Sequence, residues 1–99
     1  MRIVSKSAIV SFYQVHPEAK EKLEAWYRAC KACSATSLSE LKQTFSTADY
    51  VPKQFTVFDV GGNEYRIVTA IHYDRQIVYV REVFTHAQYD KWSRRNRAK

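Results

Sequence analysis

The chain has 99 residues, which is enough for one modest domain with a single core. Hydrophobic residues make up 45% of it, so a packed core is available and an intrinsically disordered chain is excluded. The formal net charge of +6 favours an anionic partner such as nucleic acid, an acidic protein or a membrane surface, although a basic domain without a special target fits it equally well.

The N-terminal run Arg2-Ile3-Val4 is short and apolar, which predicts a strand at the edge of a sheet. The first residues lack the long apolar region and the small-residue cleavage site of a signal peptide. No run approaches the roughly 18 apolar residues that a membrane span requires. We therefore expect a cytoplasmic protein that has no membrane partner.

Two helices are predicted after this strand. Ser5 or Ser7 is placed to cap the first one by accepting backbone N–H bonds. Its apolar residues recur at helical spacing and are Ile9, Phe12 and Tyr13. Pro17 interrupts the pattern and suits the first turn of a second helix. This second helix has an apolar stripe that indicates packing on a sheet, formed by Ala19, Leu23, Trp26, Tyr27 and Cys30.

The chain contains two cysteines, Cys30 and Cys33, in the C-x-x-C spacing of thioredoxin-like and zinc sites. The pair falls late in a helical pattern, and no second C-x-x-C or H-x-x-H completes a zinc set. A structural role is therefore favoured over a redox or metal role, and two unpaired cysteines suit a reducing compartment.

A third, short helix is predicted from the capping-box pair Ser37 and Glu40 through Leu41 to about Phe45. Residues 46–52 are expected to form a loop, and Lys53 with Gln54 leads into the next strand.

Residues 55–90 predict three short strands. Gly61-Gly62-Asn63 is predicted to join the first two strands in a tight hairpin turn, because Gly and Asn tolerate positive φ. Asp74-Arg75-Gln76 joins the second and third. Both connections are short, so neighbouring strands should be antiparallel. With a terminal helix after them, the order predicts a single α+β domain over residues 1–99, whose early helices cover one face of the sheet.

Two arginines, Arg66 and Arg81, interrupt the apolar strands, and a buried arginine without a partner is costly. Side chains alternate faces, so the two share a face if Tyr73 pairs with Val78 and do not if Tyr73 pairs with Ile77. We favour the first register, or a bulge that restores it. The two faces of the middle strand then divide into a core set, Tyr65, Ile67 and Ile71, and an open set, Arg66, Val68, Ala70 and His72.

The C-terminal segment supplies His86 and Tyr89, which share the first turn of a helix that starts near Thr85. The last nine residues contain five basic side chains and no acidic one. Such a tail suits a phosphate backbone or an acidic protein surface, although a solvated, frayed terminus has the same composition.

Two separated blocks stand out in this half of the chain, Phe58-x-Val60-Gly61-Gly62-Asn63-Glu64-x-Arg66 and Arg81-Glu82-Val83-x-Thr85-His86-x-x-Tyr89-Asp90. Together they resemble the HigB group of toxins from bacterial type II toxin–antitoxin systems, within the wider RelE-like toxins. The resemblance implies a small α+β fold with a concave sheet. It also implies an endoribonuclease that cuts mRNA, in many members while the message is on the ribosome.

The same resemblance implies a partner, a HigA-type antitoxin that carries a helix-turn-helix DNA-binding domain. The antitoxin neutralises the toxin, and their complex represses its own operon. Operator DNA would therefore be contacted only through the antitoxin complex.

The expected chemistry needs no metal or cofactor: the 2′-OH attacks the adjacent phosphorus, leaving a cyclic phosphate and a free 5′-OH. Arg66 and Arg81 are expected to clamp the phosphate, because guanidinium groups are permanently charged and bind bidentately. His86 is expected to act as an acid or base, the common role of histidine in proton transfer, while Tyr89 can donate a hydrogen bond or stack on a base. The residues expected to bind RNA are Lys53, Asn63, Lys91, Arg94 and Arg95.

Each assignment has a structural alternative. Asn63 fits the hairpin turn alone, Arg81 fits an ion pair with Glu64, and His86 fits the start of the terminal helix. For the whole chain, a non-catalytic RNA- or ribosome-binding module fits the residues almost as well as a nuclease. A toxin with another target, such as gyrase, is the third hypothesis.

Overall fold

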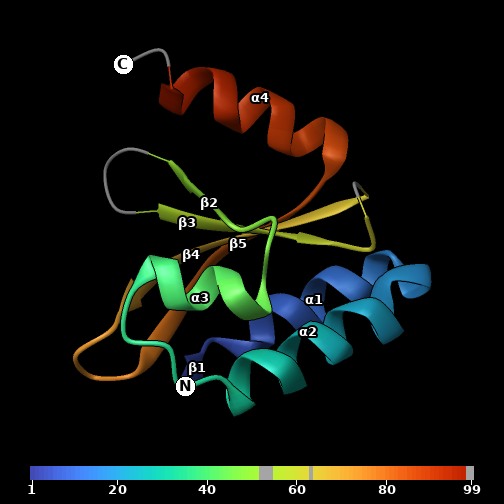
Figure 1. Cartoon of the computed structure of the whole chain (residues 1–99). Coiled ribbons are helices and arrows are strands. Elements are labelled where there is room, and N and C mark those ends of the chain that lie inside the picture. The colour runs from blue at the N-terminus through green and yellow to red at the C-terminus, as the bar shows by residue number, and fades with distance from the viewer. Residues whose placement is uncertain (52–54, 63, 98–99) are drawn as a thin grey trace.

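The computed structural model describes residues 1–51, 55–62 and 64–97, and arranges them as helices packed on a five-stranded sheet. The predicted α+β class is confirmed (Figure 1). The elements run in the order β1 (Arg2–Val4), α1 (Lys6–Val15), the short 3-10 helix η1 (Pro17–Ala19), α2 (Lys20–Ala32), α3 (Leu38–Thr44), β2 (Asp49–Val51), β3 (Phe55–Val60), β4 (Tyr65–His72), β5 (Ile77–Thr85) and α4 (His86–Arg97).

The sheet has the strand order β1-β5-β4-β3-β2. The predicted antiparallel hairpins β3–β4 and β4–β5 are confirmed, and β1 is the expected edge strand, paired parallel to β5. Gly61 and Gly62 both have positive φ at the first turn, as predicted, whereas Asn63 lies outside the described residues. The sheet thus brings the chain's first strand against its last.

The predicted loop over residues 46–52 is wrong for Asp49–Val51, which forms β2 against Phe55–Val57 at the other edge of the sheet. Three residues with one buried side chain show no alternating pattern. Their strand conformation comes from the ladder with β3, a non-local contact that local propensity cannot report. The predicted lead-in at Lys53 and Gln54 lies outside the described residues.

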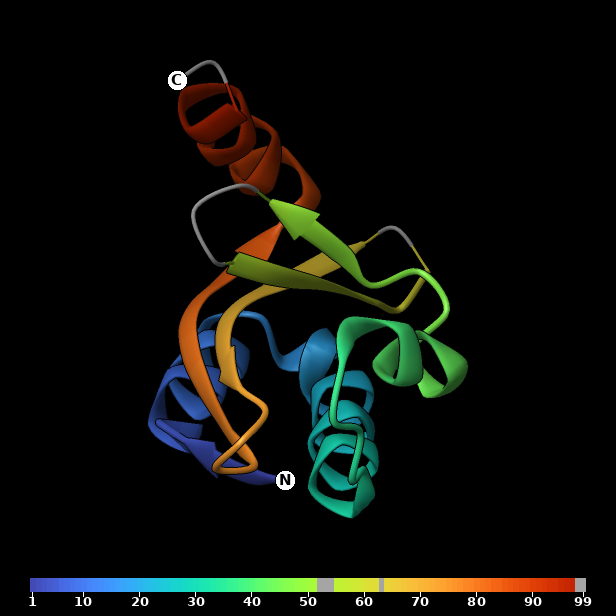
Figure 2. The same cartoon turned by 60° about the vertical axis from the view of Figure 1, so that its left-hand side comes forward.

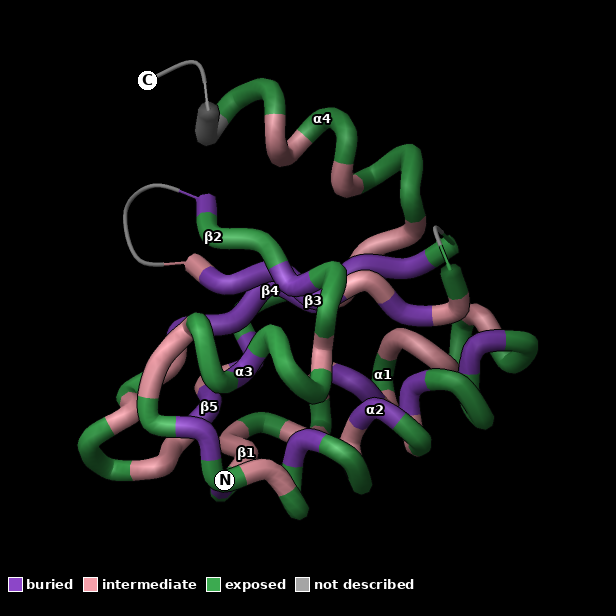
Figure 3. Tube along the Cα trace, in the orientation of Figure 1, coloured by how far each residue is buried: buried purple, intermediate pink, exposed green. Residues whose placement is uncertain are grey.

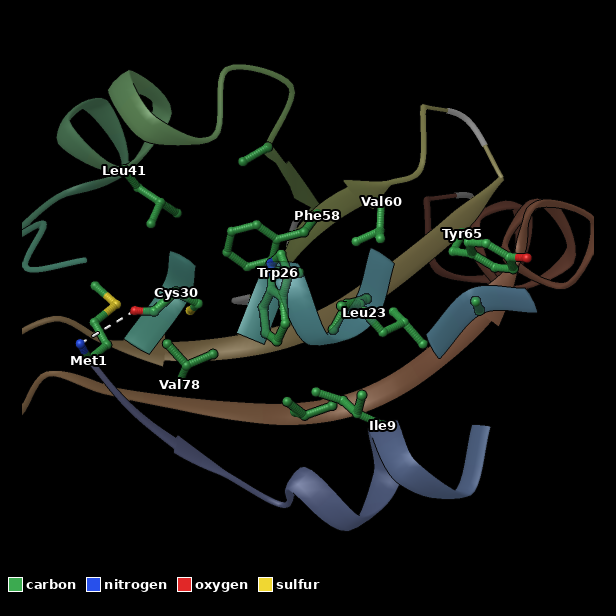
Figure 4. Close-up of a cluster of buried hydrophobic side chains, with 14 of the residues drawn as sticks. Met1, Ile9, Leu23, Trp26, Cys30, Leu41, Phe58, Val60, Tyr65 and Val78 are labelled. Atoms are coloured by element: carbon green, nitrogen blue, oxygen red, sulfur yellow. Dashed lines mark hydrogen bonds between the residues drawn. The ribbon is translucent and has the colours of Figure 1, made fainter. Parts of the chain in front are cut away.

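The main core lies between the sheet and the layer of α1, α2 and α3 (Figures 1 and 2). Trp26 and Phe45 both meet the Phe58 ring edge-on, with centroids 5.2 and 5.0 Å away. The predicted core set of β4 and the apolar stripe of α2 both face this layer, which Figure 4 shows in close-up. The apolar face of α2 and the core face of β4 therefore pack against each other, as their helical and strand periodicities predict.

The second face of the sheet is not fully open, because α4 lies across part of it (Figures 1 and 2). A smaller cluster forms there, made of Val51, Val57 and Val68 with Phe55, Phe84, Tyr89 and Trp92 against it. Figure 3 shows that most of α4 stays exposed while the strands beneath it are buried. The face expected to be open is therefore partly covered, and only the area that α4 leaves free is available to a ligand.

The capping predictions divide. Ser37 accepts a hydrogen bond from the Glu40 backbone N–H at 3.2 Å, as expected, but the Glu40 carboxylate accepts from Thr36 rather than closing back on Ser37. Ser5 occupies the N-cap position of α1 in a left-handed conformation (φ 76°) and its side chain caps nothing, and Ser7 lies inside the helix. A hydroxyl cannot reach N2 or N3 from that backbone.

Cys30 is fully buried at the end of α2, and burial raises the pKa of its thiol to about 12. A thiol with that pKa is protonated at neutral pH and a poor nucleophile or metal ligand, which supports a structural role. Among the described residues, no helix is both long and apolar enough to cross a membrane.

Candidate functional site: a polar cavity around Arg66

Arg66 is held on several sides where β4 passes beneath α4. It is only 7% exposed, and its cross-strand partner on β3 is Asp59. The guanidinium Nε lies 3.0 Å from the Asp59 carboxylate, and Nη1 donates to the Tyr65 carbonyl at 3.1 Å. The Tyr89 ring of α4 lies 5.4 Å from the guanidinium carbon, within cation–π range. The buried charge is therefore paired, and its plane is fixed.

A cavity of about 420 Å³ opens beside this pair. It lies where the segment joining α3 to β2 approaches β3, β4 and α4, and its lining is mostly polar. The lining residues are Lys42, Ser46, Thr47, Ala48, Asp49, Asp59, Arg66, Tyr89 and Ser93. Two cations, Arg66 and Lys42, and two carboxylates, Asp49 and Asp59, line the cavity, so its formal charges balance. Its suitability for an anionic group therefore rests on the oriented guanidinium of Arg66 and not on a net positive charge.

Arg81 reaches the same face as Arg66, but not the same cavity. Its guanidinium lies 5.3 Å from the Tyr79 ring and lines a second cavity, together with Val68 and Ala70. Val68 alternates with Arg66 along β4, so the two arginines share a face, as expected. The suggested ion pair of Arg81 with Glu64 does not form, because Glu64 pairs with Lys22 at 2.7 Å.

The register that produces this arrangement is neither of the two proposed. His72 pairs with Ile77, which keeps the favoured parity at the turn, and a β-bulge then shifts the ladder between Val68 and Thr69. Arg81 is the extra residue of that bulge. The shared face of the two arginines is thus confirmed, with the bulge located at Arg81 itself.

His86 is the first residue of α4 and lines neither cavity. Its backbone N–H donates to the Glu64 carbonyl at 2.9 Å, and its half-exposed ring has Nε2 3.4 Å from the Asp90 carboxylate. Since α4 begins at His86, the i,i+3 spacing puts the His86 ring one turn from Tyr89, and it is Tyr89 that lines the Arg66 cavity. Of the four predicted catalytic residues, Arg66 and Tyr89 therefore line the same cavity. Arg81 lines the second cavity, and His86 lines neither.

The residues expected to bind RNA are only partly placed. Lys53 and Asn63 lie outside the described residues. Lys91, Arg94 and Arg95 are all exposed on α4, where Arg94 Nε donates to the Asp90 carbonyl at 3.3 Å. They put positive charge on the solvent side of the helix that roofs both cavities.

Asp59 and Lys42 were missed by reasoning from the sequence. Asp59 did carry a signal, since a charge inside the apolar run of β3 needs a partner, and a hairpin in which Val60 pairs with Tyr65 puts Asp59 opposite Arg66. Lys42 carried none, because it looks like any lysine on the outer face of a short helix.

Comparison with known proteins defines the class first: residues 19–92 match the family model described as HigB_toxin, the RelE-like toxic component of a toxin–antitoxin system. The chain belongs to this HigB toxin family.

Individual relatives match along all or nearly all of the chain. The mRNA interferase toxin HigB of Escherichia coli strain K12 is 31% identical over 102 aligned positions, covering 100% of this chain and 97% of that protein. The mRNA interferase HigB of Shigella flexneri gives the same values. The mRNA interferase HigB of Escherichia coli strain CFT073 is 28% identical over 96 positions, with 95% and 93% covered.

Proposed function

We propose that this chain is an mRNA-cleaving endoribonuclease and the toxin of a type II toxin–antitoxin system. The observation that carries the proposal is the Arg66 cavity, in which a buried guanidinium is oriented by Asp59 and roofed by Tyr89. A cation fixed before the substrate arrives stabilises charge that develops on a phosphate, because little reorganisation is needed. The family and the names of the relatives point the same way.

In the proposed reaction the ribose 2′-oxygen bonds to the adjacent phosphorus while the bond from phosphorus to the 5′-oxygen breaks. The 2′-OH loses its proton to a base, and the departing 5′-oxygen gains one from an acid. Arg66 holds the phosphate oxygens, and Lys42 adds positive potential. His86, oriented by Asp90, is the proton carrier, and Tyr89 positions the nucleotide from the roof of the cavity.

The partners follow from the same proposal. A HigA-type antitoxin with a helix-turn-helix domain neutralises the toxin, and operator DNA is contacted only through that complex. The net charge of +6 favours encounter with mRNA on the ribosome, whose surface is largely RNA. An enzyme that cuts translated mRNA would act in the cytoplasm.

Induction in a bacterial host, with and without the antitoxin gene, tests this function. The wild type should arrest growth and generate mRNA fragments with 5′-OH ends. Arg66→Ala and His86→Ala should each lower cleavage about a hundredfold or more. Because His86 is exposed, its variant should keep the wild-type melting temperature, which separates lost chemistry from lost folding.

Arg28→Ala is the matched control, since it removes an exposed arginine from α2 on the far side of the sheet and should leave cleavage unchanged. Full toxicity in both site variants would refute the assignment of the site.

A second candidate is a non-catalytic RNA- or ribosome-binding module. It is favoured by one observation: Arg81 and His86 lie outside the cavity that holds Arg66. Mapping RNA ends after induction distinguishes the two functions, because a binding module arrests translation without creating new 5′-OH ends.

A further inference from the structure

The β-bulge of β5 places two consecutive residues on one side of the sheet. Thr69 pairs with Val80 and Val68 pairs with Glu82, which leaves Arg81 between the two pairs. In a regular strand Arg81 and Glu82 would point to opposite faces. Here both line one cavity with Val68, so the bulge presents a guanidinium and a carboxylate side by side.

That cavity has a volume of about 330 Å³ and lies between the sheet and α4. Its floor is apolar, formed by Val68 and Ala70, and its wall is aromatic, because Trp92 meets Phe55 with ring centroids 5.5 Å apart. An apolar slot with an aromatic wall and two polar groups at its rim has the features of a small-molecule or nucleobase site.

The cavity is adjacent to the proposed phosphate site. Val68 and Arg66 are alternate residues of β4, about 7 Å apart along the strand. Trp92 and Tyr89 stack on each other at 5.8 Å, so one aromatic pair of α4 separates the two cavities. A base in the second cavity therefore belongs to a nucleotide next to the phosphate held at Arg66.

We propose that this second cavity binds one unpaired nucleobase of the RNA, and that Glu82 and Arg81 read its edge. The inference rests on the proposed function, because it takes single-stranded RNA as the ligand. The base lies against Trp92 and Phe55, as unstacked bases do on aromatic side chains. The Arg81 guanidinium lies 5.3 Å from the centre of the Tyr79 ring, within cation–π range.

Glu82 is the informative residue of the pair. Its side chain is exposed, and no ion pair or hydrogen bond joins its carboxylate to another residue in the described part of the chain. On a surface that only held the RNA backbone, this negative charge would repel phosphates and weaken binding. Next to a base edge, by contrast, the carboxylate is useful, because it accepts hydrogen bonds from N–H groups of the base. Phosphates have no such donors.

The chemistry of the pair predicts which bases fit. An ionised carboxylate accepts hydrogen bonds only, and a guanidinium donates only. A base with an exocyclic amino group offers a donor to Glu82 and, beside it, a ring nitrogen or carbonyl acceptor to Arg81. In uracil two carbonyl oxygens flank the single N–H and repel the carboxylate. Cytosine, adenine and guanine should therefore be preferred over uracil.

Binding of 2′-O-methyl RNA hexamers tests this inference, since they lack the attacking hydroxyl and stay uncut. Oligo(C) and oligo(U) are the sharpest pair, because they differ in the group next to N3, an amine against a carbonyl. The wild type should bind oligo(C) about five- to a hundredfold more tightly. It should also lose fluorescence from Trp92 on binding, while buried Trp26 supplies a constant background.

Glu82→Gln is the variant of choice, since an exposed isosteric change keeps the fold and an amide both donates and accepts. It should bring the two affinities within about twofold of each other, whereas Glu21→Gln on α2 should leave the preference intact. Equal affinities in the wild type, or a preference that survives Glu82→Gln, would overturn the base site while leaving the nuclease proposal standing. Failure of RNA to bind or to be cut at all would refute the proposed function instead.

Discussion

The pairing of Asp59 with Arg66 makes a quantitative prediction for Asp59→Ala. Asp59 Oδ1 lies 3.0 Å from Arg66 Nε, and the Asp59 side chain is 25% exposed whereas that of Arg66 is 8% exposed. Removing one partner of a fully buried pair costs about 3–5 kcal/mol, because the other charge is left uncompensated. Asp59 retains a quarter of its exposure, so solvent screens part of the loss, and we expect about 2–3 kcal/mol.

Urea unfolding followed by circular dichroism measures that cost, and a double-mutant cycle assigns it to the pair. Asp59→Ala, Arg66→Ala and the double variant should give a coupling of about 1–3 kcal/mol, since the double variant leaves no charge behind. For a chain of this length the single variant should melt at least about 8 °C below the wild type. A loss below about 0.5 kcal/mol, or additive losses, would mean that solvent already satisfies Arg66 and that Asp59 does not orient it.

Three further predictions concern the scaffold. Gly61→Ala should destabilise by about 1–2 kcal/mol, because Gly61 has φ +65° and a Cβ there would lie 2.7 Å from the Lys22 Cδ; chemical denaturation measures it. Ser37→Ala should cost about 1 kcal/mol in the same assay by removing the N-cap of α3. The pKa of Glu24 is lowered, chiefly by the hydrogen bond from Tyr13, so its contribution is present above the unfolded pKa and lost as pH falls through the folded value. Glu24→Gln should therefore lose stability at neutral pH and less in acid, as melting curves between pH 7 and pH 3 would show.

Gly62→Ala is the control for the first of these. Gly62 has nearly the same φ, +68°, but apart from its chain neighbours no atom of the described residues lies within 4 Å of a Cβ built there. Strain alone should then give equal losses at Gly61 and Gly62, and any excess at Gly61 measures the displaced Lys22 side chain. If Ser37→Ala left the stability unchanged, the Ser37 cap would not stabilise α3. If Glu24→Gln left the dependence of stability on pH unchanged, the hydrogen bond from Tyr13 to Glu24 would not stabilise the fold.

The main layer of the fold could be predicted from the sequence because both of its surfaces carry their own periodicity. Leu23 and Trp26 repeat at helical spacing, and Ile67 and Ile71 alternate with polar or open-face positions along β4. The glycine turn fixes the hairpin between β3 and β4. Each of these signals is local, so each can be read without the partner that it packs against.

The second face could not be predicted in the same way. A bulge adds one residue to one strand, and neither its presence nor its place at Arg81 leaves a mark in residue type. The short strand β2 exists only because β3 offers it a ladder. Helix α4 has only two large apolar side chains, Tyr89 and Trp92. In the sequence, Tyr89 suits a catalytic role and Trp92 lies in the basic tail, so the two do not stand out as one packing stripe.

That sparse stripe explains why the site lies where it does. A helix with a broad apolar face would seal the sheet, whereas α4 rests on it mainly through the stacked pair Tyr89 and Trp92. Polar or half-open space is left on both sides of the pair, with Arg66 in one cavity and Arg81 in the other. The features that make α4 a poor lid, few apolar residues and a basic outer surface, are those that a single-stranded, negatively charged substrate requires. Tyr89 and Trp92 thus cover part of the sheet, while the polar remainder of α4 leaves the cavities open. The second core is smaller as a result, and RNA would enter through the space that remains.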